Sequence, residues 1–326
     1  MKDILTDISD FNENSKSISI DDLMKADTAA IKSNHKAGFV NIVGNPNVGK
    51  STLMNHLVGE RISIITSKAQ TTRHRITGIV NTPDYQIVYS DTPGVLKPKY
   101  KLQESMLEFS QGALTDADIL LYVTDVVEDP LKNQDFLEKV AKEKIPVLLV
   151  INKIDLLKGN KELEEIFSRW KEILPQATIF PASAKENFNV DNLKNTIIDL
   201  LPVSPPFFGK DALTDKPARF FVTEIIREKI LLDYDKEIPY STEVLVEQFK
   251  ETDNDIHIMT VIYVERDSQK AILIGKRGEK IKRIGIEARK DIEKFFDKKV
   301  FLEIFVKVEK DWRNKENKLR AFGYIE

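Results

Sequence analysis

One stretch of the chain, Gly44-Asn45-Pro46-Asn47-Val48-Gly49-Lys50-Ser51, has the residue types and spacing of a loop that binds phosphate groups. Its glycines allow the backbone to curl so that successive N–H groups point at one anion. Lys50 can reach the terminal phosphates of a nucleotide, and Ser51 can place its hydroxyl on a magnesium ion. The alternative, a Gly-Pro turn with a capping serine, accounts for fewer of the fixed positions. We therefore predict a nucleotide site formed by Asn45, Asn47, Val48, Gly49, Lys50, Ser51 and Thr52.

Two polar segments downstream can complete a site for Mg²⁺ and the terminal phosphate. Asp91-Thr92-Pro93-Gly94 follows an apolar run. In this segment Asp91 can hold the ion through water, and Gly94 lets a backbone N–H approach the phosphate. The same tetrapeptide alone would be a common turn. In Gln70–His74, a threonine can bind the ion only while the terminal phosphate is present, which would make this segment a switch rather than an ordinary polar loop.

Of the two threonines in the switch segment, we choose Thr72 over Thr71 because Thr72 directly precedes Arg73. This choice completes two predicted sets of residues. The predicted metal ligands are Ser51, Thr72 and Asp91, and the predicted catalytic residues are Lys50, Thr72, Asp91 and Gly94.

Two further segments predict which base the site binds. Asn152-Lys153-Ile154-Asp155 follows an apolar run, and its carboxylate can accept two hydrogen bonds from one base edge. Guanine offers an N1–H and an N2 amine side by side and adenine offers neither, so Asp155 would select GTP over ATP. Ser183-Ala184-Lys185 can present a backbone N–H to guanine O6, although it also fits a plain strand-end turn. We assign binding of GTP or GDP to Asn152, Lys153, Asp155, Ser183, Ala184 and Lys185.

The elements that must position these residues alternate between short apolar strands and helices. Strands are predicted at Phe39–Val43, Ile76–Val80, Gln86–Ser90, Ile119–Val123, Val147–Ile151 and Thr178–Ala182. Helices are predicted at Ser51–Val58, Leu102–Gly112, Gln134–Lys144, Lys161–Leu174 and Val190–Leu200. This alternation indicates an α/β fold with a doubly wound, mostly parallel sheet. The motifs at 44–51, 91–94, 152–155 and 183–185 each follow a strand, which is where such sheets bind ligands.

The rest of the chain is predicted to form a tail, a linker and a smaller α+β domain. Residues 1–36 read as a flexible tail with a weak helix over Asp21–Ile31, and the proline-rich residues 202–217 as a linker between domains at 37–201 and 218–326. In the second domain, a helical stretch is predicted to end at Phe296, and the end of the chain at Asp311–Ala321 is predicted to be partly helical. Its other predicted elements are a helix at Phe220–Leu232 and strands at Tyr240–Lys250, Ile256–Arg266 and Val300–Val308.

The second predicted domain contains a basic stretch. Between Lys270 and Lys299, eleven basic residues accompany five acidic ones, a local charge of 11 − 5 = +6 in a chain of net charge −3. This favours a polyanion as partner, although a solvated helix face would give the same count. Within the stretch, Gly275-Lys276-Arg277-Gly278 matches the G-x-x-G signature of KH domains, which clamp about four nucleotides of single-stranded RNA. We predict RNA contacts at Gly275, Lys276, Arg277, Gly278, Lys280 and Lys282.

The composition excludes several other kinds of chemistry. The chain has no cysteine, which rules out disulfides, thiolate metal sites and a cysteine nucleophile. No apolar run approaches the roughly 20 residues of a membrane span, and the first residues lack the apolar core of a signal peptide. A cytoplasmic location is therefore expected. The four histidines show no metal-ligand spacing, and Trp170 and Trp312 are expected to be packing residues.

Taken together, these motifs resemble the translation-factor class of small GTPases. Gln70–Ile76, Glu224–Lys229 and Glu265–Arg289 resemble the Era family, bacterial GTPases with a C-terminal KH domain. The resemblance covers residues 38 to 326 but not the tail. It implies binding of the 3′ end of the small-subunit rRNA and a role in assembling that subunit from the pre-30S particle. A monomer is expected, and association with the inner face of the cell membrane is left open.

The resemblance also bears on the hydrolysis of GTP. Era-like members lack the usual glutamine after the Asp-x-x-Gly turn, and here that position is Val95. Members with an asparagine at the position of Asn47 are associated with potassium beside the phosphates, and whether this chain uses K⁺ is left open.

Three rivals to this interpretation differ in testable ways. A constitutive RNA-binding module with a purely structural nucleotide site would not turn over GTP. A GTPase with two tandem GTPase domains would need a second phosphate loop, and a tRNA-modifying relative would need a C-terminal cysteine; the sequence contains neither.

Overall fold

The computed structural model describes residues 34–325, and these residues build two β-sheets, each with its own buried core. The predicted tail helix at Asp21–Ile31 lies outside the described residues. None of the described helices is both long and apolar enough to cross a membrane.

The first sheet has six strands in the order β2-β3-β1-β4-β5-β6. All neighbours are parallel except β2 and β3, which confirms the predicted doubly wound, mostly parallel α/β fold. The strands are β1 (Lys36–Gly44), β2 (Ile76–Asn81), β3 (Tyr85–Asp91), β4 (Ile119–Asp125), β5 (Val147–Asn152) and β6 (Thr178–Pro181).

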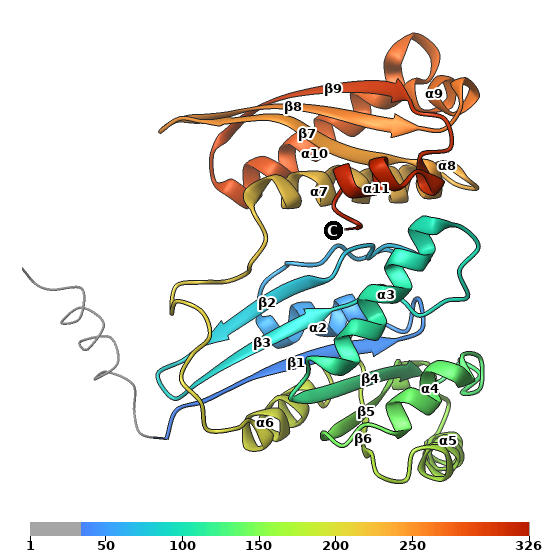
Figure 1. Ribbon diagram of the computed structural model, residues 1–326, viewed down its shortest axis with the longest axis vertical. Coiled ribbons are helices and arrows are strands. Elements are labelled where there is room, and N and C mark those ends of the chain that lie inside the picture. The colour runs from blue at the N-terminus through green and yellow to red at the C-terminus, as the bar shows by residue number, and fades with distance from the viewer. Residues whose placement is uncertain (1–33, 326) are drawn as a thin grey trace, which may run out of the picture.

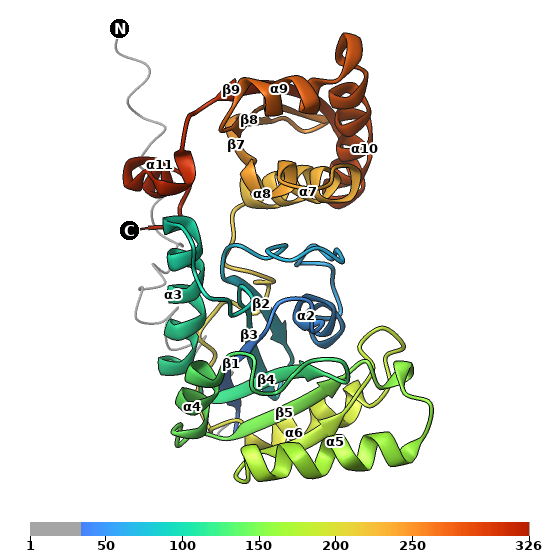
Figure 2. The ribbon, with the colours of Figure 1, turned by 90° about the vertical axis from the view of Figure 1, so that its right-hand side faces the viewer.

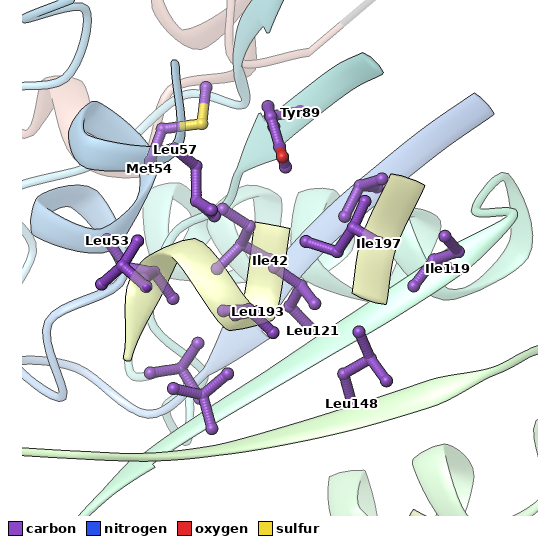
Figure 3. Packing of buried hydrophobic residues seen from close by; sticks show 14 of the residues in the cluster. Ile42, Leu53, Met54, Leu57, Tyr89, Ile119, Leu121, Leu148, Leu193 and Ile197 are labelled. Atoms are coloured by element: carbon purple, nitrogen blue, oxygen red, sulfur yellow. The ribbon is translucent and has the colours of Figure 1, made fainter. Parts of the chain in front are cut away.

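Helices cover both faces of this sheet, so its central strands β4 and β5 are buried throughout and apolar except at their carboxyl ends (Figure 1). On one face, Leu53, Met54 and Leu57 pack with Leu193 and Ile197 over the strands (Figure 3). The other face buries Trp170, which confirms that this tryptophan is a packing residue. The first face carries α2 (Lys50–Val58) and α6 (Val190–Leu200), and the second carries α3 (Lys101–Thr115), α4 (Gln134–Ala141) and α5 (Asn160–Ile173).

The second sheet has three strands in the order β7-β8-β9, with β7 antiparallel and β9 parallel to β8. Apolar residues of α7 and α10 pack on one face of this sheet. The elements are α7 (Ala218–Asp233), α8 (Ile238–Ser241), β7 (Glu243–Glu251), β8 (Asp255–Val264), α9 (Asp267–Ile274), α10 (Glu279–Phe296), β9 (Lys299–Val308) and α11 (Glu316–Ala321). We call residues 218–325 the C-terminal unit.

The predicted strand at Tyr240–Lys250 begins too early. Ile238–Ser241 forms a short helix instead, and the strand starts at Glu243. Pro239 explains the difference, because its fixed φ suits the first turn of a helix, where its missing N–H costs nothing. The predicted helix Gln134–Lys144 likewise ends earlier, at Ala141.

The proline-rich segment 202–217 runs back along the first sheet and is fixed to it. Val203 forms a β-bridge with Lys36, and the backbone N–H of Ile79 donates to Leu213 O at 2.8 Å. The side-chain oxygen of Gln86 accepts hydrogen bonds from the N–H groups of Phe207 and Phe208 at 2.7 and 3.0 Å. The segment is therefore a fixed connection rather than a free tether; the domain limits given above stay predictions.

The chain ends in a segment that packs against α3 of the first unit (Figure 2). Trp312 is fully buried, as predicted for a packing residue, and lies with Leu319 and Tyr324 against Leu102 and Met106. The two units thus share a buried apolar cluster in addition to the connecting segment.

Candidate functional site

The phosphate-loop motif forms the turn between β1 and α2, as predicted. Two of its glycines are required by close contacts. A Cβ at Gly44 would lie 2.1 Å from Val123 O, and a Cβ at Gly49 would lie 2.2 Å from the amide nitrogen of Asn152. Both glycines also have positive φ, and so does Asn47 (φ 66°). The loop therefore wraps tightly against β4 and β5 and leaves its outer side to a ligand.

A cavity of about 500 Å³ lies over this loop. It is lined by Pro46–Thr52 except Val48, by Ile64–Thr72 except Ala69, and by Gly94, Lys153 and Lys185. It thus brings together residues of five predicted motifs that lie far apart in the sequence.

Lys50 lies at the bottom of this cavity and is buried. Its ammonium donates a hydrogen bond to Asn45 O at 2.8 Å. Burial lowers the pKa of Lys50 to about 8, while the nearby carboxylates of Asp91 and Glu128 partly oppose this shift. A bound phosphate would supply the negative charge that this buried cation lacks.

We expect affinity for GTP to depend on pH through Lys50. Because the pKa of Lys50 is lowered to about 8, the ammonium is present below that pH and is lost above it. A neutral amine must take up a proton to pair with phosphate, so affinity should be constant well below pH 8 and should fall above it by up to about tenfold per pH unit. Calorimetric titration in two buffers of different ionisation enthalpy would detect this proton uptake. Equal affinity at about pH 7 and about pH 9 would contradict the shift.

The three predicted metal ligands meet at one corner of the cavity. The hydroxyl of Ser51 lies 2.9 Å from that of Thr72, and it donates to Asp91 Oδ2 at 2.7 Å. The Thr72 hydroxyl lies 3.3 Å from the same carboxylate oxygen. Thr71, in contrast, uses its hydroxyl with Thr66 and with Lys68 O. The geometry thus favours Thr72 over Thr71.

The residues at this corner fit a magnesium ion. Asp91 is fully buried, and its Oδ1 has no hydrogen-bond partner. Burial raises the pKa of Asp91, although Lys50 and nearby hydroxyls oppose the rise. A cation would satisfy this orphaned oxygen and would favour the charged carboxylate. Among residues 34–325, no cluster of three or more His, Asp or Glu side chains could hold a metal alone, so the ion would need phosphate oxygens, as Mg²⁺ commonly does.

The turn after Asp91 lies against the phosphate loop. A Cβ at Gly94 would lie 2.6 Å from Pro46 Cα, so glycine alone allows this approach. The backbone N–H of Val95 donates to Gly44 O at 3.1 Å, and the Val95 side chain is buried in the core beside Val43. Val95 therefore faces away from the phosphates and cannot orient water.

Asn152 joins the base-recognition segments to the phosphate loop. Its amide nitrogen donates to Val48 O at 2.7 Å, and its amide oxygen accepts from the Ala184 N–H at 2.9 Å. Asp155 is exposed, and one of its oxygens accepts from the Ser183 hydroxyl at 2.5 Å. The carboxylate is thus oriented by a neighbour while remaining accessible to a base.

The G-x-x-G segment connects α9 to α10 in the C-terminal unit. Gly275 and Gly278 have positive φ, and Lys276 and Arg277 between them are exposed. A Cβ at Gly275 would lie 2.7 Å from the Lys280 side chain, which leaves no space for a larger residue. The turn therefore presents two cations and a bare backbone to solvent.

A groove of about 280 Å³ lies beside this turn, between α10 and β9. Of the residues that line it, only Lys282 was predicted from the sequence. The groove forms where α10 packs beside β9, and the sequence of either element alone does not indicate that packing. Gly285 leaves this part of α10 without a side chain facing Ile304, and a Cβ there would lie 3.6 Å from Ile304 Cδ1. The lining residues are Ile281, Lys282, Gly285, Ile286, Arg289, Leu302 and Ile304.

Asn133 and Lys153 also support the nucleotide site. The Asn133 amide nitrogen donates to Val95 O at 3.0 Å and also contacts Asn45, so it bridges the phosphate loop and the turn after Asp91. The Lys153 ammonium donates to Asn47 O and to Asp125, both at 2.6 Å. Asn133 had no motif around it from which its role could have been predicted.

Two family models match the chain. One is described as a 50S ribosome-binding GTPase and matches residues 39–153; the other is a KH domain and matches residues 237–313. The first ends at the base-recognition segment, and the second contains the G-x-x-G turn and both walls of the groove.

Characterised relatives match nearly the full length of the chain. GTPase Era of Staphylococcus haemolyticus is 44% identical over 90% of this chain and 98% of the relative, and that of Staphylococcus epidermidis is 43% identical over the same shares. Among solved structures, Era in complex with MgGDPNP and nucleotides 1506–1542 of 16S ribosomal RNA is 39% identical, with a TM-score of 0.86 over 90% of this chain and 100% of that one. A variant of Aquifex aeolicus Era bound to GDP and aluminium fluoride is 39% identical, with a TM-score of 0.85 over 89% of this chain and 100% of that one. The chain therefore belongs to the Era family of GTPases.

Proposed function

We propose that this protein is a GTP-hydrolysing switch that binds the 3′ end of the small-subunit rRNA and assists assembly of that subunit from the pre-30S particle. The observation that carries the proposal is the presence, in one chain, of the Lys50 cavity with its Ser51–Thr72–Asp91 corner and of an exposed G-x-x-G turn. The full-length similarity to Era proteins, one of them solved with MgGDPNP and 16S rRNA nucleotides, supports the same assignment.

In the proposed reaction, the protein acts mainly by positioning and by charge. Lys50 and the loop amides would stabilise the negative charge that develops on the phosphates. Ser51, Thr72 and, through water, Asp91 would hold Mg²⁺, which neutralises phosphate charge when bound. Gly94 would bring its N–H to the terminal phosphate. Because Val95 is buried and apolar, the side chain directly after the turn cannot act as a base.

The base pocket completes the nucleotide site. Asp155 would accept the N1–H and N2 hydrogens of guanine, and the segment around Ala184 would contact O6. The hydrogen bonds of Asn152 keep both segments fixed to the phosphate loop. The proposed site therefore binds GTP and GDP through the same base contacts and distinguishes them only by the contacts to the terminal phosphate of GTP.

Potassium beside the phosphates is a further part of the proposal. Asn47 is exposed on the cavity wall, and its amide nitrogen already donates to Ser67 O at 3.1 Å, so its amide oxygen is the atom left for a cation. We expect single-turnover GTP hydrolysis to be faster in potassium than in sodium. Equal rates in the two salts would remove K⁺ from the proposal.

The proposal places the protein in the cytoplasm as a monomer. Peripheral association with the inner face of the cell membrane is a second location within the same proposal.

The RNA part of the proposal predicts the effect of reversing charge at the G-x-x-G turn. Changing Lys276 and Arg277 to Asp should weaken binding of a single-stranded rRNA 3′-end oligonucleotide steeply, because it places negative charge where the phosphates would run. The salt dependence of binding should flatten as cationic contacts are lost. Fluorescence anisotropy over a salt series measures both effects.

Both side chains are exposed, so the double variant should keep its fold and its affinity for GTP. Circular dichroism and GTP titration provide these controls. Wild-type RNA affinity in the folded double variant would refute the assignment of residues 270–299 to RNA binding.

A further inference from the structure

The residue that follows Thr72 reaches across to the C-terminal unit. The Arg73 side chain is fully buried. It donates to Thr242 O at 2.8 Å, to Glu243 Oε2 at 3.0 Å and to Pro239 O at 2.9 Å. The three acceptors lie on α8, on Thr242 directly after it, and at the start of β7. Arg73 is therefore fixed by three hydrogen bonds from outside its own unit.

The backbone that precedes Thr72 is held from the same side. Arg227 on α7 donates to Thr71 O at 3.0 Å and is within 3.4 Å of Gln70 O. Arg227 is itself paired with Glu224 at 2.5 Å, and both side chains are buried. The C-terminal unit thus contacts the switch segment immediately before and immediately after Thr72, while the Thr72 hydroxyl faces Ser51 and Asp91.

Glu243 is the one acidic partner of the buried Arg73 guanidinium among the described residues. Its Oε2 also accepts a hydrogen bond from the Tyr324 hydroxyl at 2.7 Å. The Tyr324 ring stacks on His74 at a centroid distance of 4.2 Å. Glu243 is therefore the carboxylate that hydrogen-bonds the Arg73 guanidinium, while the buried Glu224 interacts with Arg73 only through the electrostatic field.

The buried contact between Arg73 and Glu243 is expected to be either fully formed or fully broken. A buried guanidinium that loses its carboxylate partner is strongly disfavoured, so Arg73 either stays with Glu243 or leaves the interface with the whole segment. We propose that Glu243 and Arg227 are positioning residues for GTP hydrolysis: from the C-terminal unit, they hold the Thr72 segment where the Thr72 hydroxyl can bind Mg²⁺. This inference rests on the proposed GTPase function and adds residues from the RNA-binding unit to it.

The same helix that holds the switch segment also contacts the helix that follows the G-x-x-G turn. Lys229 on α7 pairs with Asp291 on α10, and Asp233 on α7 pairs with Arg283 on α10. Glu228, directly before Lys229 on α7, pairs with Arg61 of the first unit. Helix α7 therefore contacts both the switch segment and α10, and Figure 2 shows it on the side of the C-terminal unit that faces the first unit.

The test compares Glu243→Gln with a matched control on the same strand. Glu243→Gln keeps the side-chain shape and removes the charge that balances Arg73. Glu247→Gln removes an exposed carboxylate that pairs with Lys307 at 3.0 Å and touches nothing near the switch segment. Full-length wild type and both variants are titrated with Mg²⁺ in the presence of a fluorescent non-hydrolysable GTP analogue and, separately, of fluorescent GDP.

In the GTP form, Glu243→Gln should need up to about ten to a hundred times more Mg²⁺ for half-maximal binding, the range seen when the support of a metal ligand is lost, because Glu243 holds the residue next to Thr72. In the GDP form it should match wild type, because Thr72 binds the ion only with the terminal phosphate present. Glu247→Gln should match wild type in both forms. Thr72→Ala gives the reference for full loss of the ligand.

Two results would overturn the inference: no change in Mg²⁺ dependence, or an equal change with GTP and GDP, which would mean that Glu243 only supports the fold. If Glu243→Gln does not fold, as judged by circular dichroism, the same Mg²⁺ titrations are carried out on Arg73→Lys. This variant keeps the positive charge but cannot make all three hydrogen bonds, so it should need more Mg²⁺ in the GTP form only. Failure of the proposed function itself looks different, because wild type would then show no Mg²⁺-dependent GTP binding at all.

Discussion

Asp155→Asn should exchange a preference for GTP for a preference for xanthosine triphosphate. In the wild type the exposed carboxylate, oriented by the Ser183 hydroxyl at 2.5 Å, would accept both hydrogens of the guanine edge. The variant amide can donate to the 2-oxo group of xanthine and can no longer accept two hydrogens with full charge. Losing a charged hydrogen bond costs roughly 1.5–3 kcal/mol, so GTP affinity should fall by about tenfold to over a hundredfold.

Calorimetric titration with both nucleotides measures this exchange. Asp253→Asn, in the exposed turn between β7 and β8, is a suitable control because it makes the same chemical change far from the cavity. An unchanged preference for GTP in the Asp155 variant would remove this residue from the base pocket.

Lys50→Ala should abolish measurable GTP hydrolysis. Lys50 is a buried cation that lines the cavity over the phosphate loop, and its loss would leave developing charge to the backbone amides and the magnesium ion. Removal of such a preorganised electrostatic group commonly costs about a hundredfold to a thousandfold in rate. Single-turnover release of phosphate, with the protein in excess over GTP, measures this step.

Val95→Ala is the matched variant for this experiment. Val95 follows Gly94, but its side chain packs in the core, so turnover should continue while stability falls by about 1–2 kcal/mol for the two lost methyl groups. Loss of turnover in a folded Val95→Ala protein, or full turnover in Lys50→Ala, would contradict the mechanism proposed here.

The nucleotide site was largely predictable because its parts are local. Each motif is a few consecutive residues after an apolar strand, and parallel strands bring their carboxyl ends to one edge of a sheet. Phe39–Val43, Gln86–Ser90 and Val147–Ile151 were therefore enough to place the loops that follow them together. The choice of Thr72 over Thr71 rested on one neighbouring residue, and the structure places the Thr72 hydroxyl beside Ser51.

The interface between the units was not predictable, because its contacts join residues far apart in the chain. Arg73 meets partners 166 to 170 residues further on, and nothing near Arg73 in the sequence indicates Glu243. Tyr240–Lys250 has the alternating residues of a strand, and only Pro239 indicates that a helical turn comes first. The residues of β9 that line the groove were not predicted for the same reason as the contacts of Arg73. Both depend on packing between elements that lie far apart in the sequence.

The position of the Arg73 contacts has a consequence for the order of events during synthesis. Domains generally fold as they leave the ribosome, from the N-terminus onward. A nascent chain that has emerged as far as residue 217 contains all six strands of the first sheet and the whole nucleotide cavity. It does not yet contain Glu243 or Tyr324, so Arg73 and His74 have none of the C-terminal partners that hold them. A ribosome-bound chain of this length would therefore bind GTP before it could hydrolyse it efficiently, and the later emergence of Glu243 and Tyr324 would complete the proposed switch.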